Sequence, residues 1–194
     1  MEGSIFIAGA GVQWLRDRMK FFKKAPETEK IVKSLQNNND IYLVPAFTGL
    51  GAPYWDANAR GVLSGITRDT SPKEIVRATI EAVAYQTHDL FEAMKHDGLR
   101  PKIVKVDGGM VMNNWFSQFL SDIVNVKVLR PKVQETTALG AAFMAGLYLG
   151  VYKSLKDISK NWNLDKKFSP KMKNKSRTIL INGWEKAVKR ALIN

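Results

Sequence analysis

Hydrophobic and polar positions along the chain follow two different periods, which predicts strands and helices in turn. Short apolar runs predict strands at 4–8, 41–47, 102–109 and 126–131. Helices are predicted at 12–22, 27–35, 114–123, 137–152 and 183–192. Strands that alternate with helices are typical of an α/β fold.

The strongest helix signal is the sequence SPKE at 71–74. Ser71 can cap a helix, Pro72 suits its first position, and Glu74 can complete a capping box. Apolar positions at helical spacing continue from there to the sequence HDG at 96–98, where Gly98 can end the helix. A long helix with one buried face is therefore predicted between these two signals.

The longest apolar stretch, ALGAAFMAGLYLGVY, runs from 138 to 152. It is shorter than the roughly 20 residues that a membrane-spanning helix needs. Glu135 and Lys153 flank it. We predict a buried helix here and no membrane span.

Positive charge is concentrated at the end of the chain. The net charge is +12, but residues 153–194 hold twelve Lys and Arg against three acidic residues. This uneven distribution of charge predicts a main domain at 1–152 and a basic C-terminal extension with a terminal helix at 153–194. A lysine-rich solvated face is the favoured interpretation of the extension, and a nucleic-acid-binding module is kept as a minor alternative.

The composition excludes several kinds of site. The chain has no Cys and only two His, which excludes disulfides, thiolate zinc sites and a thiol nucleophile, and no metal site is expected. The first ten residues lack the positive charge and long apolar run of an export signal, so a cytoplasmic protein is expected.

Two glycine turns are candidates for a binding site. In VKVDGGMVMNN at 104–114, paired glycines stand between a predicted strand and a helix. Backbone amides at such a turn can hold phosphate, although an isolated pair is more often an ordinary tight turn. In FIAGAGVQWL at 6–15, Trp14 stands where a dinucleotide fingerprint needs its third glycine, and the sequence has no Walker A motif. The remaining hypothesis is that both turns line one cleft.

Several motifs together resemble one family. They are, in chain order, AGAGVQWLRD, VPAFTGLGAPYWD, ARGVLSGITR, VRATIEAVAYQT, VDGGMVMNN and TALGAAFMAGL. They resemble the glycerol kinases of the FGGY carbohydrate kinase family. The segment 61–81 also fits that family's signature, with glycine, acidic and small residues at the expected spacings: Gly65, Glu74, Ala78 and Glu81. The resemblance covers essentially the whole chain but only the carboxyl-terminal portion of the family's chain.

The resemblance implies a ribonuclease H-like, actin/Hsp70-like ATPase fold, in which two domains close around ATP. This chain would be most of the second domain, without the β-hairpin that begins it. The matching motifs imply that Gly9 and Gln13 contact the nucleotide from one turn, and that Gly109 and Asn113 contact it from the other. The complete enzyme would transfer the γ-phosphoryl group of ATP to glycerol, giving glycerol 3-phosphate.

Each candidate side chain also has a simpler interpretation. Gln13 could be a helix-surface amide, and Asn113 could be a helix cap. Asp107 could be a base or a metal ligand, but an acid that organises the turn is favoured, because the residue belongs to the nucleotide side. Backbone amides suit polyphosphate, and an Asn amide can hydrogen-bond adenine or ribose.

The regions expected to hold the polyol and the catalytic base have no counterpart here. The fragment alone is therefore expected to be inactive. The expected cofactors are ATP and Mg²⁺, with Mg²⁺ held mainly by ATP and the other half, and glycerol would bind only with an N-terminal half. A non-catalytic remnant or subunit that needs a separately encoded N-terminal half is the main alternative. Homo-oligomerisation is left open.

Overall fold

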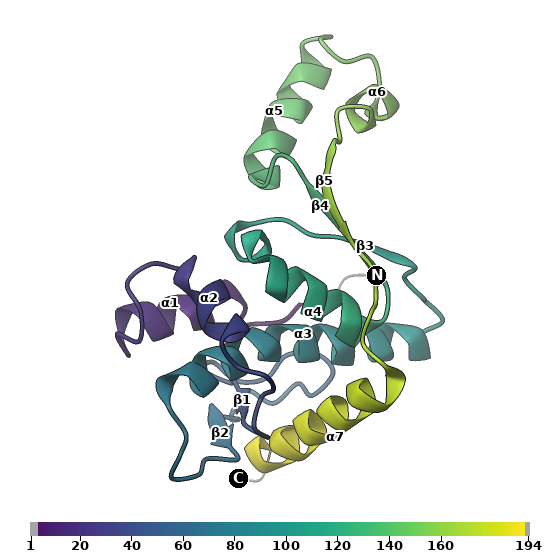
Figure 1. The fold of residues 1–194 in the computed structure, drawn as a ribbon. Coiled ribbons are helices and arrows are strands. Elements are labelled where there is room, and N and C mark those ends of the chain that lie inside the picture. The colour runs from purple at the N-terminus through teal and green to yellow at the C-terminus, as the bar shows by residue number, and fades with distance from the viewer. Residues whose placement is uncertain (1–3, 193–194) are drawn as a thin grey trace.

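The computed structural model describes residues 4–192. The helices are α1 (Gly9–Asp17), α2 (Glu27–Lys33), α3 (Pro72–His96), α4 (Asn114–Val124), α5 (Thr136–Tyr148), α6 (Leu155–Ser159), α7 (Asn174–Ala191) and the 3₁₀ helix η1 (Gly109–Met112). The strands are β1 (Tyr42–Val44), β2 (Val62–Ser64), β3 (Ile103–Lys105), β4 (Lys127–Pro131) and β5 (Leu164–Phe168). The expected α/β class is confirmed (Figure 1).

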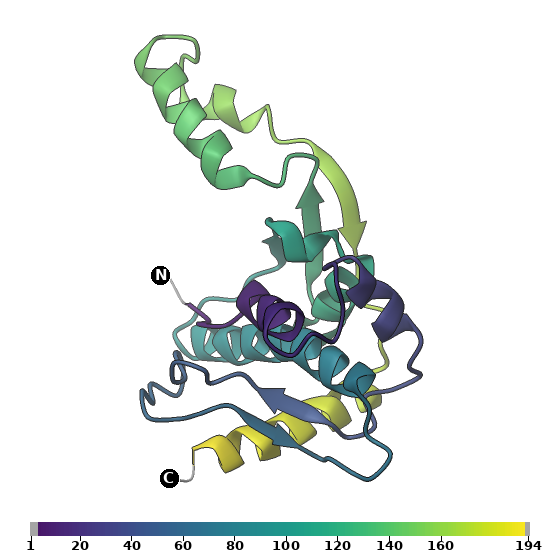
Figure 2. The ribbon, with the colours of Figure 1, turned by 90° about the vertical axis from the view of Figure 1, so that its left-hand side faces the viewer.

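The long helix α3 is the centre of the main body (Figure 1). The predicted capping box is present, because the Ser71 hydroxyl accepts from the Lys73 N–H at 3.2 Å and the Ser71 N–H donates to Glu74 Oε2 at 3.0 Å. Helices α1, α2 and α4 pack against α3. The antiparallel pair β1–β2 lies between α3 and α7 (Figure 2).

The hydrophobic core joins these elements through large side chains. Leu15 of α1, Val32 of α2 and Trp184 of α7 are each fully buried. Tyr85 of α3 stacks on Trp184 with ring centroids 5.4 Å apart and meets Phe119 of α4 edge-on at 5.7 Å. Aromatic burial of this size contributes much of the stability of a small core. Helices α1, α2, α4 and α7 therefore share one hydrophobic core with α3.

A second sheet has the strand order β3-β4-β5. Strands β3 and β4 are parallel, with Val104 opposite Val128, and β5 is antiparallel to β4. The sheet rises from the main body and leads to an arm that holds α5 and α6 (Figures 1 and 2). None of the helices within residues 4–192 is both long and apolar enough to cross a membrane.

The prediction that 137–152 forms a buried helix is half right. The helix is present as α5, but none of its residues is buried, and Tyr148 is 90% exposed. The physical reason is that α5 lies on the projecting arm, where α6 is its neighbour and the main body does not cover it (Figure 2). An apolar sequence indicates that a helix would be stabilised by packing against other elements. It does not show that such elements lie next to the helix.

The predicted strand at 4–8 is wrong. Within the described residues no strand pairs with this segment, and a single extended segment cannot form a sheet without a partner. The segment is held instead by the buried side chain of Ile7 and by the hydrogen bond from Gln86 Nε2 to the Ile7 carbonyl at 3.2 Å. The described chain has no β-hairpin before α1.

The C-terminal segment is more regular than predicted. It adds α6 and β5, and its last helix begins at Asn174, nine residues before the predicted start at 183. Charged positions in β5 hide the strand signal because most of that strand is exposed. Trp184 Nε1 donates to Asp89 Oδ2 at 2.7 Å, so α7 packs into the same core as α3. The division of the chain at residue 152 stays a prediction.

Candidate functional site

A cleft of about 320 Å³ lies between α1, α2 and the turn that contains η1. The four residues singled out from the sequence all line it: Gly9, Gln13, Gly109 and Asn113. Gly9 and Gly109 are 100 residues apart along the chain, and packing on α3 brings their segments together. The two glycine turns therefore line one cleft. A nucleotide contact by these residues stays a prediction.

Gly9 and Gly109 leave open space in the cleft. A β-carbon at either position would meet no atom within 4 Å, and neither residue has a positive φ angle. Neither packing nor backbone conformation therefore requires glycine at these two positions. The missing side chains instead let a ligand approach the backbone closely, as phosphate-binding turns need.

Gly11 has a different role, although it is only two residues from Gly9. A β-carbon at Gly11 would lie 2.9 Å from the Thr79 methyl group of α3. The absence of a side chain therefore lets α1 sit close against α3. This contact fixes the helix that carries Gln13, whose exposed side chain lines the cleft.

Asn113 combines a structural role with a place in the cleft. Its Oδ1 accepts from the Phe116 N–H at 3.0 Å and caps α4, as one sequence interpretation expected. Its Nδ2 donates to Thr28 Oγ1 at 3.4 Å, so the amide nitrogen points toward α2. The cap therefore uses only one end of the side chain and leaves the other end as a donor at the cleft.

Helix α2 supplies a wall that the sequence did not reveal. Thr28 and Glu29 line the cleft, and Glu29 Oε2 accepts from the Asn114 N–H at 3.4 Å. Burial opposes the charge on Glu29, but Lys33, whose Nζ lies 2.5 Å from Glu29 Oε1, and the Asn114 N–H outweigh it and lower the pKa of Glu29. Only the tertiary fold brings this wall to the site, and no local motif marks it.

The chemistry of the cleft is mixed. Its apolar lining comes from α1, the loop before α2, α3 and η1 and comprises Val12, Ala25, Pro26, Ile80, Met110 and Met112. Its polar groups are amides, a hydroxyl, a carboxylate and the guanidinium of Arg16, which forms a pair with Asp17 at 2.7 Å. Helix α1 begins at Gly9 without a side-chain cap from the described residues. The Gly11 N–H donates to the Ala8 carbonyl at 3.0 Å, which leaves the N–H groups of Gly9 and Ala10 as the ones that could meet an anion. Apolar walls with a polar rim suit a nucleoside with attached phosphates.

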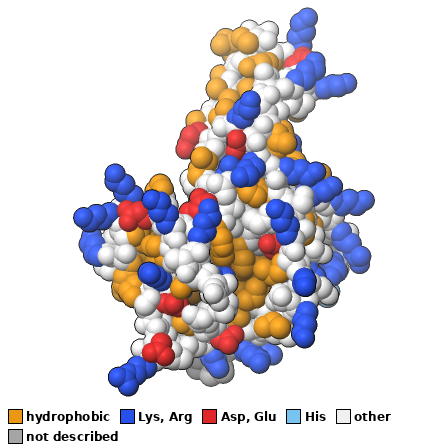
Figure 3. Space-filling view, viewed as in Figure 1, with side chains coloured by type: hydrophobic (Ala, Val, Ile, Leu, Met, Phe, Trp, Pro, Cys, Tyr) orange, Lys and Arg blue, Asp and Glu red, His pale blue; other side chains and the backbone are white. Residues whose placement is uncertain are grey.

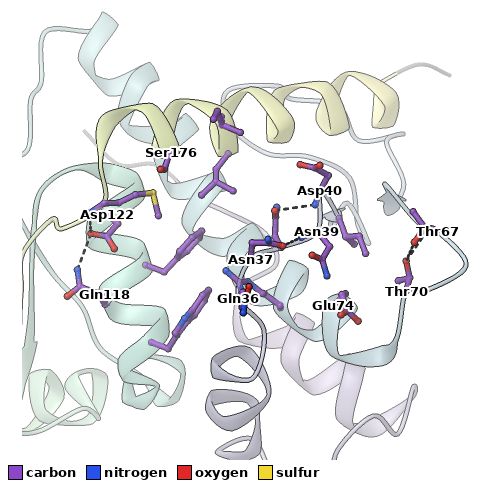
Figure 4. A pocket seen from close by; sticks show the side chains of 18 of the residues that line it. Gln36, Asn37, Asn39, Asp40, Thr67, Thr70, Glu74, Gln118, Asp122 and Ser176 are labelled. Atoms are coloured by element: carbon purple, nitrogen blue, oxygen red, sulfur yellow. Dashed lines mark hydrogen bonds between the residues drawn. The ribbon is translucent and has the colours of Figure 1, made fainter.

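A larger hollow of about 990 Å³ lies elsewhere, between the 36–41 loop, the start of α3, α4 and α7. Hydrophobic side chains lie at its bottom (Figure 3), and Asp122 and Gln118 face it from α4 (Figure 4). Asp122 Oδ1 accepts from Gln118 Nε2 at 3.1 Å and from the Lys171 N–H at 2.6 Å. This carboxylate holds the chain before α7, so we interpret it as structural. None of the four predicted residues lines this hollow.

No group of three or more His, Asp or Glu side chains within residues 4–192 is arranged to hold a metal ion. Asp107, the acid considered from the sequence, is exposed and does not line the cleft. The described part of the chain therefore provides the lining for a ligand without a metal cluster of its own.

Comparisons with known proteins give the same picture at the level of the family. The sequence model of the C-terminal domain of the FGGY family of carbohydrate kinases matches residues 1–149. Glycerol kinase 1 of Pseudomonas aeruginosa is 55% identical over 98% of this chain and 38% of its own length. Glycerol kinase of Thermoanaerobacter pseudethanolicus is 52% identical over 99% of this chain and 39% of its own length.

Solved structures confirm the expected fold. The crystal structure of Plasmodium falciparum glycerol kinase with ADP matches 99% of this chain and 38% of its own chain, with a TM-score of 0.87 and 38% identity. Xylulose kinase from Lactobacillus acidophilus matches 97% of this chain with a TM-score of 0.78 and 24% identity, which shows likeness of fold alone. The chain spans less than two fifths of the length of the relatives that it matches.

The match over residues 1–149 covers the cleft and every sequence motif on which the resemblance rests. The chain therefore belongs to the FGGY family of carbohydrate kinases, and most of it is the family's C-terminal domain, with the actin/Hsp70-like fold of sugar kinases.

Proposed function

We propose that this chain is the ATP-binding part of a glycerol kinase. The complete enzyme would transfer the γ-phosphoryl group of ATP to a terminal hydroxyl of glycerol. The observation that carries the proposal is the cleft, where two distant glycine turns with open β-carbon positions meet two amide side chains. The high identity to proteins named glycerol kinase, and the ADP named for the Plasmodium structure, support this choice of nucleotide and acceptor.

The residues of the cleft fit a nucleoside triphosphate. Backbone N–H groups at Gly9 and Gly109 would bind phosphate oxygens, because no side chain at either position blocks the approach. The amides of Gln13 and Asn113 would hydrogen-bond the nucleoside, and the apolar lining would pack against the base. Mg²⁺ would be held mainly by ATP and by the other half, since the described residues offer no cluster of metal ligands.

The remaining parts of the reaction would come from the N-terminal half. Phosphoryl transfer needs a group that positions and activates the acceptor hydroxyl, and we assign this group, together with the glycerol site, to the part that the relatives have in addition. The isolated chain would then bind nucleotide without phosphorylating glycerol. Because ATP and glycerol are metabolites of the cell interior, we place the protein in the cytoplasm.

A second candidate is a subunit or a remnant that acts only with a separately encoded N-terminal half. The chain matches 38% of the length of Glycerol kinase 1 of Pseudomonas aeruginosa. A reading frame next to this one that encodes the missing half would support the subunit. The lack of such a frame, together with no ATP binding, would favour the remnant.

The test is a calorimetric titration of Mg-ATP into the full chain, alone and co-expressed with the N-terminal part of a glycerol kinase. We expect Gln13→Ala to weaken binding by about tenfold, since a lost hydrogen bond to a ligand costs about 1.4 kcal/mol. Asn113→Asp keeps the acceptor that caps α4 and removes the Nδ2 donor, so it should weaken binding without unfolding α4. Gln36→Ala, an exposed amide outside the cleft, is the matched control.

Unchanged affinity in both cleft variants of a folded assembly would overturn the assignment of these residues. A folded assembly that binds no Mg-ATP would overturn the proposed nucleotide site as a whole. Circular dichroism of each variant would establish that it is folded.

A further inference from the structure

The turn that carries Gly109 and Asn113 is held by one buried side chain, Arg130 of β4, which is 6% exposed. Arg130 does not line the cleft itself. Its Nη1 donates to the Val111 carbonyl at 2.8 Å and to the Met112 carbonyl at 3.3 Å. These carbonyls lie at the end of η1, where a helix leaves its C=O groups without partners of its own. Arg130 supplies donors to them and closes the end of the turn.

The same guanidinium group also reaches the first residue of α4. Its Nη2 donates to Asn114 Oδ1 at 3.3 Å, and Lys166 Nζ of β5 donates to the same oxygen at 3.0 Å. The Asn114 N–H in turn donates to Glu29 Oε2, in the α2 wall of the cleft. One side chain therefore connects η1, the start of α4 and, through Asn114, the α2 wall.

Strand β5 holds Arg130 in this position. Arg130 Nε donates to Asp165 Oδ2 at 2.7 Å, and the Phe168 ring lies against the guanidinium group, with 5.6 Å between Cζ and the ring centroid. A buried charge needs such partners, because burial alone would disfavour it. Asp165 and Phe168 both lie beyond residues 1–149, the part that the family model matches. The segment after residue 152 thus contacts the η1 turn through Arg130.

Arginine is the side chain that can make these contacts together. Its planar group has donors on three nitrogens, and here all three are used, by acceptors on η1, α4 and β5. Lysine carries the same charge on a single nitrogen, so it cannot reach acceptors on three separate elements at once. The site therefore uses the shape of the guanidinium group as well as its charge.

We propose that Arg130 is a positioning residue for the nucleotide. It fixes η1 in the shape that presents Gly109 and Asn113 to the cleft together, and Asp165 keeps Arg130 in place. The inference rests on the proposed function for the identity of the ligand. Because Arg130 does not line the cleft, its effect on binding passes through the turn.

The turn needs such a contact because its backbone is permissive. Gly108 and Gly109 restrict their own φ and ψ angles little, and Gly108 has a φ of 81°. Without Arg130, two carbonyls would each lose a donor, and the turn would sample several shapes. A turn that is already ordered binds a ligand more tightly, because binding does not have to order it.

The first experiment measures the turn without nucleotide. Hydrogen exchange of residues 109–114 is followed by mass spectrometry in the full chain and in its Arg130→Lys variant, with residues 72–96 of α3 as the internal reference. We expect exchange at 109–114 to rise about tenfold in the variant and exchange in α3 to change less, because lost hydrogen bonds open the turn locally. Unchanged exchange at 109–114, or equal changes in both segments, would overturn the proposal.

The second experiment measures Mg-ATP affinity by calorimetry, in the chain assembled with the N-terminal part of a glycerol kinase. Arg130→Lys should weaken binding about tenfold, and Asp165→Ala, which leaves Arg130 its other contacts, about threefold. Asp157→Ala is the matched control for Asp165, since it removes an acid of the same segment that pairs with Lys160. Equal affinities in the Asp165 and Asp157 variants would contradict the role of Asp165.

A stability control separates positioning from folding. Asp89→Ala removes a buried acceptor outside the cleft and should lower the urea midpoint of unfolding without changing Mg-ATP affinity. Equal losses of affinity in the Asp89 and Arg130 variants would overturn the proposal. Asp165→Ala, whose carboxylate is 39% exposed, carries the same comparison if Arg130→Lys does not fold.

A double variant tests whether Arg130 acts through the turn. Gly109→Ala fills the open space at the turn. Substitutions at independent sites add in free energy, whereas substitutions that disturb the same turn do not. The loss of affinity in Arg130→Lys with Gly109→Ala should therefore be smaller than the product of the two single losses. A loss equal to that product would show that Arg130 acts on binding by another route and would overturn the proposal.

The two experiments also separate this inference from the proposed function. Faster exchange of the turn, together with no Mg-ATP binding by the parent, would retain Arg130 as the group that holds the turn and overturn the nucleotide site. Mg-ATP binding that Arg130→Lys leaves unchanged would do the reverse.

Discussion

Gly9 and Gly11 lie two residues apart in α1, but only Gly11 is packed against another helix. Gly11 touches α3, where a β-carbon would lie 2.9 Å from a methyl group of Thr79, while a β-carbon at Gly9 would meet nothing within 4 Å. The sequence shows both as parts of one motif and cannot tell them apart. The difference separates a residue required for packing from a residue that leaves room for a ligand.

We therefore predict opposite effects of two alanine substitutions. Gly11→Ala should lower the free energy of unfolding by about 1–3 kcal/mol, as overpacking does. Gly9→Ala should leave stability within about 0.5 kcal/mol, as surface substitutions do, and should weaken Mg-ATP binding by the assembled enzyme. Urea denaturation and calorimetry measure the two effects. Similar losses of stability in both variants would contradict the distinction.

Glu29 gives a prediction about pH. Its folded-state pKa is lowered, so the contacts of this carboxylate with Lys33 and Asn114 add stability above its ordinary pKa of 4.5, and this contribution is lost as the pH falls through the lowered pKa. Glu29→Gln should therefore cost about 0.5 kcal/mol at pH 7 and less at pH 3. Denaturation at both pH values measures the difference. A cost that grows on acidification would show that the carboxylate does not stabilise the fold.

At the scale of elements, local sequence signals predicted the start of α3 correctly. They did not predict which other elements pack against a given segment. The capping box marked the start of α3 correctly because its hydrogen bonds are made within four residues. The strand at 4–8 and the burial of α5 were wrong because both depend on partners distant in the sequence. The α2 wall of the cleft was missed for the same reason. The glycine turns of Gly9 and Gly109 were candidates from the residue pattern, whereas the choice of Gln13 and Asn113 came from the resemblance to a known family.

One carboxylate of α3 adds a polar contact to the stacking of Tyr85 on Trp184 of α7. Asp89 Oδ2 accepts from both Tyr54 Oη and Trp184 Nε1, each at 2.7 Å, and the Trp184 side chain is fully buried. Burial, together with the charge of Asp89, raises the pKa of Tyr54, so its phenol stays a donor.

Asp89→Ala should thus lower the free energy of unfolding by about 2–4 kcal/mol, because two donors lose their acceptor. Glu92→Ala on the same helix removes an exposed pair with Lys95 and should cost less than about 1 kcal/mol. Urea denaturation of both variants makes the comparison. Equal costs would mean that α7 is held by apolar packing alone.

At the scale of the whole molecule, the chain has a compact body and an uncovered arm (Figures 1 and 2). We predict no measurable glycerol phosphorylation by the purified chain, because the proposed acceptor site belongs to the other half. Activity should appear on assembly with the N-terminal part of a glycerol kinase and fall with Asn113→Asp. A coupled assay of ADP release measures both. Turnover by the isolated chain would show that it holds an acceptor site of its own.

Because α1, α2 and α4 all pack on α3, a ligand in the cleft would join segments that are far apart in the unfolded chain. The unfolded chain cannot offer such a site, so the ligand should act as a reversible cross-link of the native state. A concentration 100 times the dissociation constant would then add about 2.7 kcal/mol to the free energy of unfolding. The cleft thus makes the stability of the body itself a function of the nucleotide concentration around it.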